Sequence, residues 1–314
     1  MTENIIGIDL GGTMVKIGIV DPKNGILKKD EIETKIELGF ERVVERICQK
    51  ITEIVDISNV RAVGVGSPGS IDHDKGIIKF SPNFPDWNNV PLKAEIEKHL
   101  RLSVFIENDA NSAALGEKWF GEGKGKDHIV VLTLGTGIGG GVITHGKLLT
   151  GNTGIGAELG HMIVDPHGPI CGCGNYGCLE AMASATALIR YANEGRKRFP
   201  ESKIFELEKQ RGVLGAREIF DAYRLKDRLA TRIFETFVEA MSVGITSIIH
   251  IFNPQVVILG GGMSKSADLF IPKIREKVDM RAIPSFLGTF EIVGSKLGND
   301  AGILGAAAIA LENL

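Results

Sequence analysis

Residues 5–20 read IIGIDLGGTMVKIGIV, which is an apolar stretch, a glycine turn and a second apolar stretch. Apolar stretches separated by a short Gly-rich segment predict two strands joined by a tight turn. Residues 129–143 read IVVLTLGTGIGGGVI and repeat this order, with a longer glycine turn at 135–141. A unit that recurs within one chain indicates an internal duplication. We therefore expect two related halves that begin near residues 5 and 129.

Between and after these units, helical and strand patterns alternate. Apolar residues at helical spacing predict helices, and short apolar runs that end in Gly or Pro turns predict strands. The expected strands are 61–66, 103–106 and 255–259, and the expected helices are 40–55, 91–100, 110–119 and 301–312. Such alternation predicts an α/β fold. The duplication suggests a small N-terminal domain over residues 1–115 and a larger C-terminal domain over 116–299.

The composition excludes several classes of protein. The 314 residues carry a net charge of −3 without a strongly basic region, so neither nucleic acid nor a membrane surface is an expected partner. The longest apolar stretch, residues 234–252, contains Glu239 and His250, which favours a buried core helix over a membrane span. Residues 1–6 lack the pattern of a secretory signal. Three of the four cysteines fall within residues 171–178, which favours a reducing cytoplasm over a secreted disulfide framework.

Glycine is the unusual residue of this composition, with 40 in the chain. Three expected strands end in Gly-rich turns, at residues 9–13, 135–141 and 260–262. Glycine accepts positive φ angles and lets backbone N–H groups approach an anion closely, so such turns form nests that hold phosphate. Thr13 and Thr136 add hydroxyl donors to two of them. The alternative is that the glycines only make tight hairpins.

These turns match neither of the two common nucleotide motifs. The pattern GxxxxGK[ST] does not occur, and the glycines from Gly135 onward lead into a strand rather than a helix. P-loop NTPases and Rossmann dehydrogenases are therefore disfavoured. Two glycine hairpins in duplicated halves are instead the arrangement of the actin-like (ribonuclease H-like) ATPase fold, in which the nucleotide lies in a central cleft between two domains.

A cysteine-rich segment, residues 161–178, gives a second candidate site. It supplies one imidazole and three thiolates, a full set for tetrahedral zinc, from His161, Cys171, Cys173 and Cys178. Four protein ligands close the coordination shell, so we expect a zinc knuckle with a structural ion. Two alternatives remain: three unrelated thiols, or a His161 ring that contacts only a substrate.

Two carboxylates flank this knuckle, Glu158 before it and Glu180 after it. Carboxylates accept paired hydrogen bonds from neighbouring hydroxyls, which is how proteins hold sugars. A rigid knuckle between the two acids would fix both, which favours a sugar site over the alternative of two surface acids.

Asp109 lies between an expected strand end and an expected helix start. A helix N-cap is one interpretation. The other is a general base, because a helix N-terminus favours the ionised carboxylate and Asn108 beside it can orient a hydroxyl. Asp9, before the first glycine turn, is the candidate for Mg²⁺, through water. Asp300, at the start of the last helix, is expected to be a cap.

Six stretches now stand in order along essentially the whole chain: Asp9–Thr13, Glu107–Asp109, Leu134–Gly141, Glu158–His161, Cys171–Glu180 and Gly260–Gly262. Together they resemble the ROK family (repressors, open reading frames and kinases), and within it the bacterial-type glucokinases. The stretch from Gly160 to Cys178 is the most specific part of the match. The sequence departs from the family pattern at Met14, where many relatives have Lys or Asn, and Lys16 follows two residues later.

The resemblance implies an actin-like fold of two α/β domains whose last helix, about 300–314, packs on the first domain. It implies that Asp109 deprotonates the 6-hydroxyl of a sugar. The other sugar contacts it implies are Gly69, Asn83, Asn108, Glu158, His161 and Glu180. It places ATP at the glycine turns, so that the cofactor-binding residues are Asp9, Gly11, Gly12, Thr13, Gly135, Thr136, Gly137, Gly139, Gly140, Gly141, Gly260, Gly261 and Gly262.

The expected reaction is transfer of phosphate from Mg²⁺–ATP to the 6-hydroxyl of a hexose, with glucose preferred and zinc held by His161 and the three knuckle cysteines. The alternatives are a ROK kinase for fructose, mannose, N-acetylglucosamine or N-acetylmannosamine, a polyphosphate donor, and a non-catalytic sugar sensor like the family's repressors. Asp109, and the short segment before Ile5 with no room for a DNA-binding motif, favour the kinase. The resemblance also implies a homodimer or homotetramer.

Overall fold

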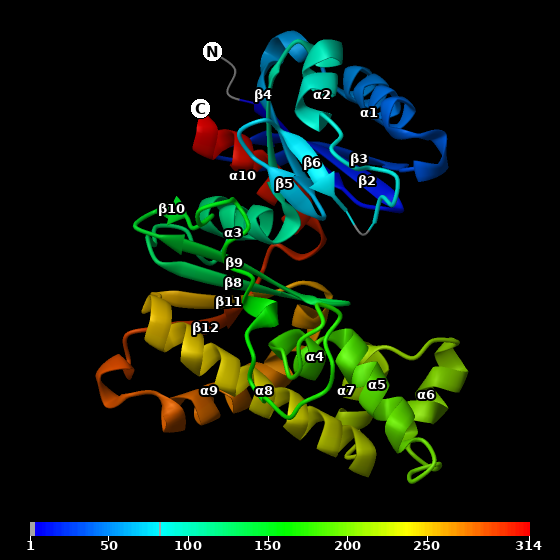
Figure 1. Ribbon diagram of the computed structural model, residues 1–314, viewed down its shortest axis with the longest axis vertical. Coiled ribbons are helices and arrows are strands. Elements are labelled where there is room, and N and C mark those ends of the chain that lie inside the picture. Colours follow the sequence, from blue (N-terminus) through cyan, green and yellow to red (C-terminus); the bar gives the residue numbers. More distant parts are fainter. Residues whose placement is uncertain (1–3, 82) are drawn as a thin grey trace.

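A computed structural model describes residues 4–81 and 83–314 and has two lobes (Figure 1). The upper lobe in that view holds a five-stranded sheet in the order β3-β2-β1-β4-β7. Its strands are β1 (Asn4–Leu10), β2 (Met14–Asp21), β3 (Gly25–Glu33), β4 (Val60–Ser67) and β7 (Ser103–Asn108). A second, two-stranded sheet joins β5 (Ser70–Asp72) to β6 (Ile77–Phe80).

The lower lobe repeats the five-stranded sheet in the order β10-β9-β8-β11-β12. Its strands are β8 (Ile129–Leu134), β9 (Ile138–Thr144), β10 (Lys147–Leu148), β11 (Val256–Gly260) and β12 (Glu291–Gly294). β1 pairs antiparallel with β2 and parallel with β4, and β8 pairs in the same way with β9 and β11. The same strand order and directions in both lobes confirm the expected duplication.

Helices cover both faces of the upper sheet, which explains why its central strands are apolar on both sides. On one face Ile6 and Ile8 of β1 share a core with α1 (Phe40–Ile54) and α2 (Leu92–Leu100). On the other face Ile5 packs with residues of α10 (Ala301–Asn313). Ile5, Ile6 and Ile8 are each fully buried.

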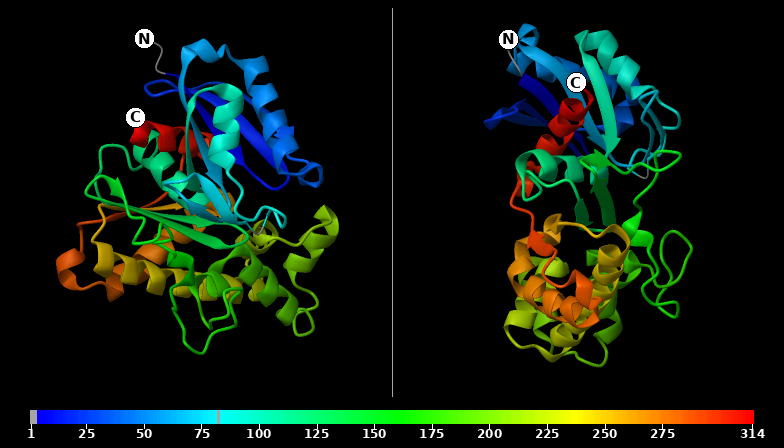
Figure 2. Two further views of the ribbon diagram at one scale, coloured as in Figure 1. Left: turned by 45° about the horizontal axis from the view of Figure 1, so that its top comes forward. Right: turned by 90° about the vertical axis from the view of Figure 1, so that its left-hand side faces the viewer.

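Two helices lie between the sheets: α10 and α3 (Asp109–Phe120) (Figures 1 and 2). α10 approaches β1 and β4 so closely that a Cβ on Gly7 or Gly64 would overlap carbonyl oxygens of α10. α3 packs on β8 and β9 and also on α10, where Gly116 lies against Gly305. The last helix of the chain therefore returns to the upper lobe after the lower lobe is complete.

The rest of the lower lobe is helical. α8 (Arg228–Phe252) runs through its core and packs against α4 (Leu179–Ala183), α5 (Ala185–Gly195), α7 (Ala216–Arg224) and α9 (Ala267–Arg281), and α6 (Lys203–Arg211) packs on α7. Among the described helices, α8 alone is long and apolar enough to cross a membrane, yet 67% of its apolar window is buried inside the protein. It is the core helix expected at residues 234–252.

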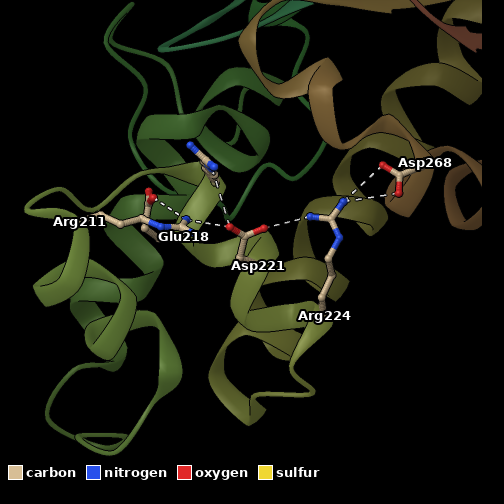
Figure 3. A network of polar contacts seen from close by, with 6 residues as sticks. Arg211, Glu218, Asp221, Arg224 and Asp268 are labelled. Carbon is tan, nitrogen blue, oxygen red and sulfur yellow. Dashed lines mark hydrogen bonds and ion pairs between the residues drawn. The ribbon is translucent and has the colours of Figure 1, made fainter.

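An ion-pair network joins three helices of this lobe (Figure 3). At the end of α6, Arg211 Nη1 lies 3.0 Å from Glu218 Oε1 and 2.7 Å from Asp221 Oδ2, both on α7. From α7, Arg224 reaches Asp221 at 3.1 Å and Asp268 of α9 at 3.4 Å. Glu218 is only 3% exposed, so Arg211 supplies the charge that makes its burial tolerable.

Candidate functional site

The carboxyl ends of the parallel strands of both sheets face one another between the lobes. They enclose a cavity of about 140 Å³. Its lining includes Asp9 at the end of β1, Asp109 at the start of α3, and Gly260 and Gly261 at the end of β11. A crevice at the carboxyl ends of strands is where α/β proteins bind ligands. The structure therefore brings together three segments that the sequence assigned to one site.

Asp109 is the first residue of α3, but it is not the N-cap. The cap is Asn108, whose Oδ1 accepts a hydrogen bond from the backbone N–H of Asn111 at 2.7 Å. The carboxylate of Asp109 is thus left open to solvent at the floor of the cavity. Desolvation by the surrounding protein raises the pKa of Asp109. The negative charges of Asp9 and Glu158 raise this pKa further, whereas backbone N–H groups at the helix start lower it.

Asp9 lines the same cavity as Asp109, and both lie at the carboxyl ends of strands of the upper sheet. Its Oδ2 lies 3.7 Å from Nζ of Lys16, which follows Met14 by two residues on the same side of β2. On its other side lies Gly302 of α10, where a side chain would overlap the carboxylate. Burial raises the pKa of Asp9, and Lys16 only partly offsets this effect. A carboxylate whose charge is only partly offset by Lys16 suits a divalent cation, which is the role expected for Asp9.

The first glycine turn, Gly11–Thr13, connects β1 to β2 beside this cavity. The N–H of Gly11 donates to the carbonyl of Met14 at 3.1 Å and closes the hairpin. Within residues 4–81 and 83–314, the N–H groups of Gly12 and Thr13 have no hydrogen-bond partner. These two N–H groups are therefore available to an anion.

The second glycine turn is shorter than the sequence suggested. It spans Gly135–Gly137 and is closed by a hydrogen bond from Gly135 N–H to the Gly137 carbonyl at 3.0 Å. Among the described residues, the N–H groups of Thr136 and Gly137 are unpaired, as in the first turn. The prediction that the turn continues to Gly141 is wrong, because β9 already begins at Ile138.

Three glycines of that stretch belong to β9 and have a packing reason. A Cβ on Gly139 would lie 2.9 Å from the Cβ of Ala110, and one on Gly141 would lie 2.6 Å from the Cβ of Ala114, both on α3. A Cβ on Gly140 would lie 2.6 Å from the carbonyl oxygen of Ala157 on the other face. The lack of side chains lets α3 lie directly on the strand, which brings Asp109 to the second turn.

The third turn, Gly260–Gly262, follows β11 and leads into a 3₁₀ turn at Gly262–Ser266. Gly261 has a φ of +80°, and a Cβ there would overlap the carbonyl of Leu134. Asp300, nearby in sequence to α10, has no side-chain cap hydrogen bond. Its Oδ1 instead lies 2.6 Å from Nζ of Lys29, so the expected cap role is wrong.

The residues expected to hold a sugar come from both lobes. From the upper lobe, Asn83 lies against Gly12, and Gly69 adopts a φ of +114° where the chain turns between β4 and β5. From the lower lobe, Glu158 is exposed and precedes the 3₁₀ turn Leu159–His161. The negative charge of Glu158 contributes to the raised pKa of Asp109.

Glu180 makes a contact that the sequence did not suggest. Its Oε2 accepts a hydrogen bond from the backbone N–H of Ile138 at 2.9 Å, immediately after the second glycine turn. Its Oε1 lies 3.7 Å from Sγ of Cys171. Glu180 therefore joins the glycine turn to the cysteine-rich segment.

The four expected metal ligands form a compact cluster. The ligand atoms of His161, Cys171, Cys173 and Cys178 all lie within 4.8 Å of one another. Sγ of Cys171 is 3.6 Å from Nδ1 of His161, and Sγ of Cys173 is 3.7 Å from Sγ of Cys178. A tetrahedron with Zn–S bonds of about 2.3 Å has S···S edges of about 3.8 Å, so the geometry fits zinc.

One polar cluster beside the site could not be predicted from the sequence. Nδ1 of His73, in the β5–β6 turn, lies 3.0 Å from Oε2 of Glu107, and its Nε2 lies 2.9 Å from the Gly154 carbonyl in the lower lobe. Glu107 Oε1 accepts from the N–H of Asn108 at 2.7 Å. Proximity to Glu107 raises the pKa of His73 to about 9. No spacing pattern links His73 to Glu107, so only the fold could reveal the pair.

Comparison with known proteins agrees with this geometry. The ROK family model matches residues 5–313. The chain is 53% identical over 310 residues to the glucokinase of Thermotoga maritima, covering 99% of this chain and 98% of that protein. The solved ROK hexokinase of Thermus thermophilus superposes with a TM-score of 0.84 at 35% identity and covers 99% of both chains.

A ROK family glucokinase from Streptomyces griseus, solved in complex with glucose and AMPPNP, superposes with a TM-score of 0.82 at 36% identity. It covers 98% of this chain and 99% of that chain. The similarity thus extends over both lobes, the cavity between them and the cysteine-rich segment. The chain belongs to the ROK family, and its duplicated two-lobed fold is the actin-like ATPase fold of that family.

Proposed function

We propose that this protein is an ATP-dependent hexose kinase that phosphorylates glucose at the 6-hydroxyl. The observation that carries the proposal is the cavity between the lobes. Asp9 and Asp109 line it, and the strands that contribute Asp9 and Thr133 to its lining run on into glycine turns with N–H groups that are unpaired among the described residues. The whole-chain identity of 53% to a glucokinase supports ATP and glucose as the two substrates.

Asp109 is the general base of the proposed reaction. The oxygen of the sugar 6-hydroxyl attacks the γ-phosphorus of ATP, the bond from that phosphorus to the β–γ bridging oxygen breaks, and the hydroxyl proton passes to the Asp109 carboxylate. ADP leaves with the bridging oxygen. The raised pKa of Asp109 suits this task, because a base is most effective when its pKa approaches the working pH.

The nucleotide lies along the three glycine turns. The unpaired N–H groups of Gly12, Thr13, Thr136 and Gly137 bind phosphate oxygens, and the adenosine lies near Gly260–Gly262. Gly139, Gly140 and Gly141 act indirectly, by letting α3 approach β9. Asp9 would hold Mg²⁺ through water, and the ion would supply positive charge to the transferring phosphate.

The sugar is oriented by polar groups from both lobes. Glu158, His161 and Glu180 accept or donate hydrogen bonds from the lower lobe, and Gly69, Asn83 and Asn108 line the opposite wall. Asn108 and Glu180 are already held by hydrogen bonds to the backbone N–H groups of Asn111 and Ile138. Such orientation lowers the entropic cost of reaching the reactive geometry.

His161, Cys171, Cys173 and Cys178 hold a structural zinc ion. When bound, the ion cross-links two ends of the knuckle and so fixes Glu180 and the His161 ring. His161 reaches the cluster through one ring nitrogen, and the other nitrogen can then orient a sugar hydroxyl.

The proposal also covers organisation beyond the site. Residues 1–115 and the helix at 300–314 form one domain and residues 116–299 the other, a division supported by the packing of α10 on β1 and β4. We propose a homodimer or homotetramer in the cytoplasm. Exposed apolar side chains on the knuckle, Ile163, Ile170 and Tyr176, support self-association.

A coupled assay of ADP release tests the proposed function. The protein with Mg²⁺–ATP is given glucose, mannose, fructose, N-acetylglucosamine, N-acetylmannosamine and allose in turn. We expect kcat/KM to be highest on glucose. A higher value on another sugar would contradict the glucose assignment, and binding of sugar without any turnover would replace the kinase with a sensor.

A further inference from the structure

A threonine hydroxyl donates a hydrogen bond to a carbonyl of the first glycine turn, and another does so in the second. In the first turn, Oγ1 of Thr34 donates to the Gly11 carbonyl at 2.6 Å, and the N–H of Thr34 donates to the Thr13 carbonyl at 2.9 Å. Thr34 follows β3 and is only 1% exposed. The sequence gives no sign of this contact, since Thr34 lies far from the turn along the chain.

The second turn is held in the same way from a different element. Oγ1 of Thr186, in the first turn of α5, donates to the Thr136 carbonyl at 2.8 Å. The N–H of Ala185 donates to the Gly135 carbonyl at 2.9 Å. In both turns, therefore, two carbonyls accept hydrogen bonds from a neighbouring segment, one of them from a threonine hydroxyl.

These contacts set the direction of the unpaired N–H groups. In a trans peptide the C=O and the following N–H point in opposite directions within one plane, and the described residues contain no cis peptide. A hydroxyl on the Gly11 carbonyl therefore turns the Gly12 N–H away from Thr34. A hydroxyl on the Thr136 carbonyl likewise turns the Gly137 N–H away from Thr186. Each threonine hydroxyl therefore orients a peptide whose N–H is unpaired among the described residues and belongs to a glycine, Gly12 in the first turn and Gly137 in the second.

We propose that Thr34 and Thr186 are positioning residues for the phosphates of the nucleotide. Each fixes a peptide plane so that the Gly12 or Gly137 N–H is already aimed at a phosphate oxygen. Glycine turns are otherwise free to rotate these peptides, because glycine accepts positive and negative φ alike. The inference rests on the proposed function for the identity of the anion, a nucleoside triphosphate.

The two threonines differ in burial, which predicts unequal effects. Thr34 is only 1% exposed, whereas Thr186 is exposed and its turn is also held by Glu180 through the Ile138 N–H. Loss of the Thr34 hydroxyl should therefore weaken nucleotide binding more than loss of the Thr186 hydroxyl.

The test uses Thr34→Val and Thr186→Val, which remove the hydroxyl and keep the shape, with Thr34→Ser and Thr186→Ser as matched controls that keep the hydroxyl. Affinities for AMPPNP and for glucose are measured separately by titration calorimetry. We expect Thr34→Val to bind AMPPNP about three- to tenfold more weakly, since a hydrogen bond contributes about 0.5–1.5 kcal/mol. Thr186→Val should show a smaller loss, glucose affinity should not change, and the Ser variants should bind normally.

Steady-state kinetics give a second test, because a purely structural role would not change the KM for one substrate alone. The KM for Mg²⁺–ATP should rise in the Val variants while the KM for glucose stays constant. Val variants that bind AMPPNP as tightly as wild type, or that lose glucose and nucleotide affinity together, would overturn the proposal. If Thr34→Val does not fold, the exposed Thr186→Val decides. A wild type that binds AMPPNP but phosphorylates no hexose would refute only the proposed function, and one that binds no nucleotide would refute both.

Discussion

At the scale of single residues, Asp109 experiences two opposing influences. Backbone N–H groups at the start of α3 stabilise its carboxylate, whereas desolvation by the surrounding protein and the carboxylates of Asp9 and Glu158 destabilise it. The net effect is a raised pKa. Asn108 provides the side-chain cap of α3, so Asp109 is not needed as the N-cap. A carboxylate so placed is available for proton transfer.

Replacement of Asp109 by Asn should therefore remove catalysis and leave the fold intact. We expect kcat to fall by about 10²–10⁴-fold, the usual contribution of a positioned base. Glucose affinity should change little, because Asn keeps the shape and one acceptor oxygen. Turnover is measured by ADP release and affinity by calorimetry. Near-normal turnover in this variant would exclude Asp109 as the base.

The raised pKa of Asp109 also predicts how activity depends on pH. The base must be deprotonated, so kcat/KM should decline on acidification as Asp109 takes up a proton. Because its pKa is raised, this decline should begin clearly above about pH 4, where an ordinary aspartate titrates. The measurement is kcat/KM for glucose against pH, with stability followed in parallel. A profile that stays flat down to pH 4 would contradict the shift.

At the scale of elements, the His73 turn links three segments. It joins the β5–β6 hairpin to the end of β7 through Glu107, and to the lower-lobe loop through the Gly154 carbonyl. Glu107 in turn holds the N–H of Asn108. The segment that carries Asp109 is thus supported by an imidazole from another hairpin.

This link should make stability depend on pH in a defined direction. The folded pKa of His73, about 9, is raised above its unfolded value of 6.5, so the stabilisation is complete below pH 6.5 and is lost as pH rises through 9. His73→Gln should therefore cost about 1–3 kcal/mol at pH 6 and much less at pH 10. Denaturant unfolding at both pH values checks this. His99→Gln, which removes a histidine paired with Glu95 on α2, is the control.

The knuckle is the second element whose contribution can be measured. Removal of its metal by chelation, or Cys173→Ser, should release one zinc per chain and lower Tm by roughly 5–10 °C, because a structural metal contributes folding free energy. Cys48→Ala removes the one thiol outside the cluster and should release no metal. Metal analysis and calorimetry give both numbers. Native protein without zinc would contradict the assignment.

The elements also show what the sequence could predict and what it could not. Strand, turn and helix patterns are local, so the place of Asp109 where β7 ends and α3 begins followed from them. The need for glycine at positions 139 and 141 is not local, because a Cβ there would collide with Ala110 or Ala114 of α3. The same is true of His73 with Glu107 and of Thr34 with Gly11, whose partners the fold alone brings together.

At the scale of the whole molecule, the duplication explains where the site lies. Both sheets end their first strand in a glycine hairpin, and α3 and α10 lie between the two sheets, with residues of both helices and of both first strands lining one cavity. The lobes meet through these helices and through the His73 contact with Gly154. The expected sugar contacts are divided between lobes, with Asn83 above and Glu158 below.

Because sugar contacts come from both lobes, glucose should bind most tightly when the lobes approach each other, and binding should close the cavity. We expect small-angle scattering to show a smaller radius of gyration at saturating glucose. Asp109→Asn with glucose should show the same contraction, since closure depends on binding and not on turnover. A panel sugar that calorimetry shows does not bind should leave the curve unchanged. If glucose binding is demonstrated by calorimetry while the scattering dimensions stay the same, the lobes are already closed around the site and the sugar enters a preformed cavity.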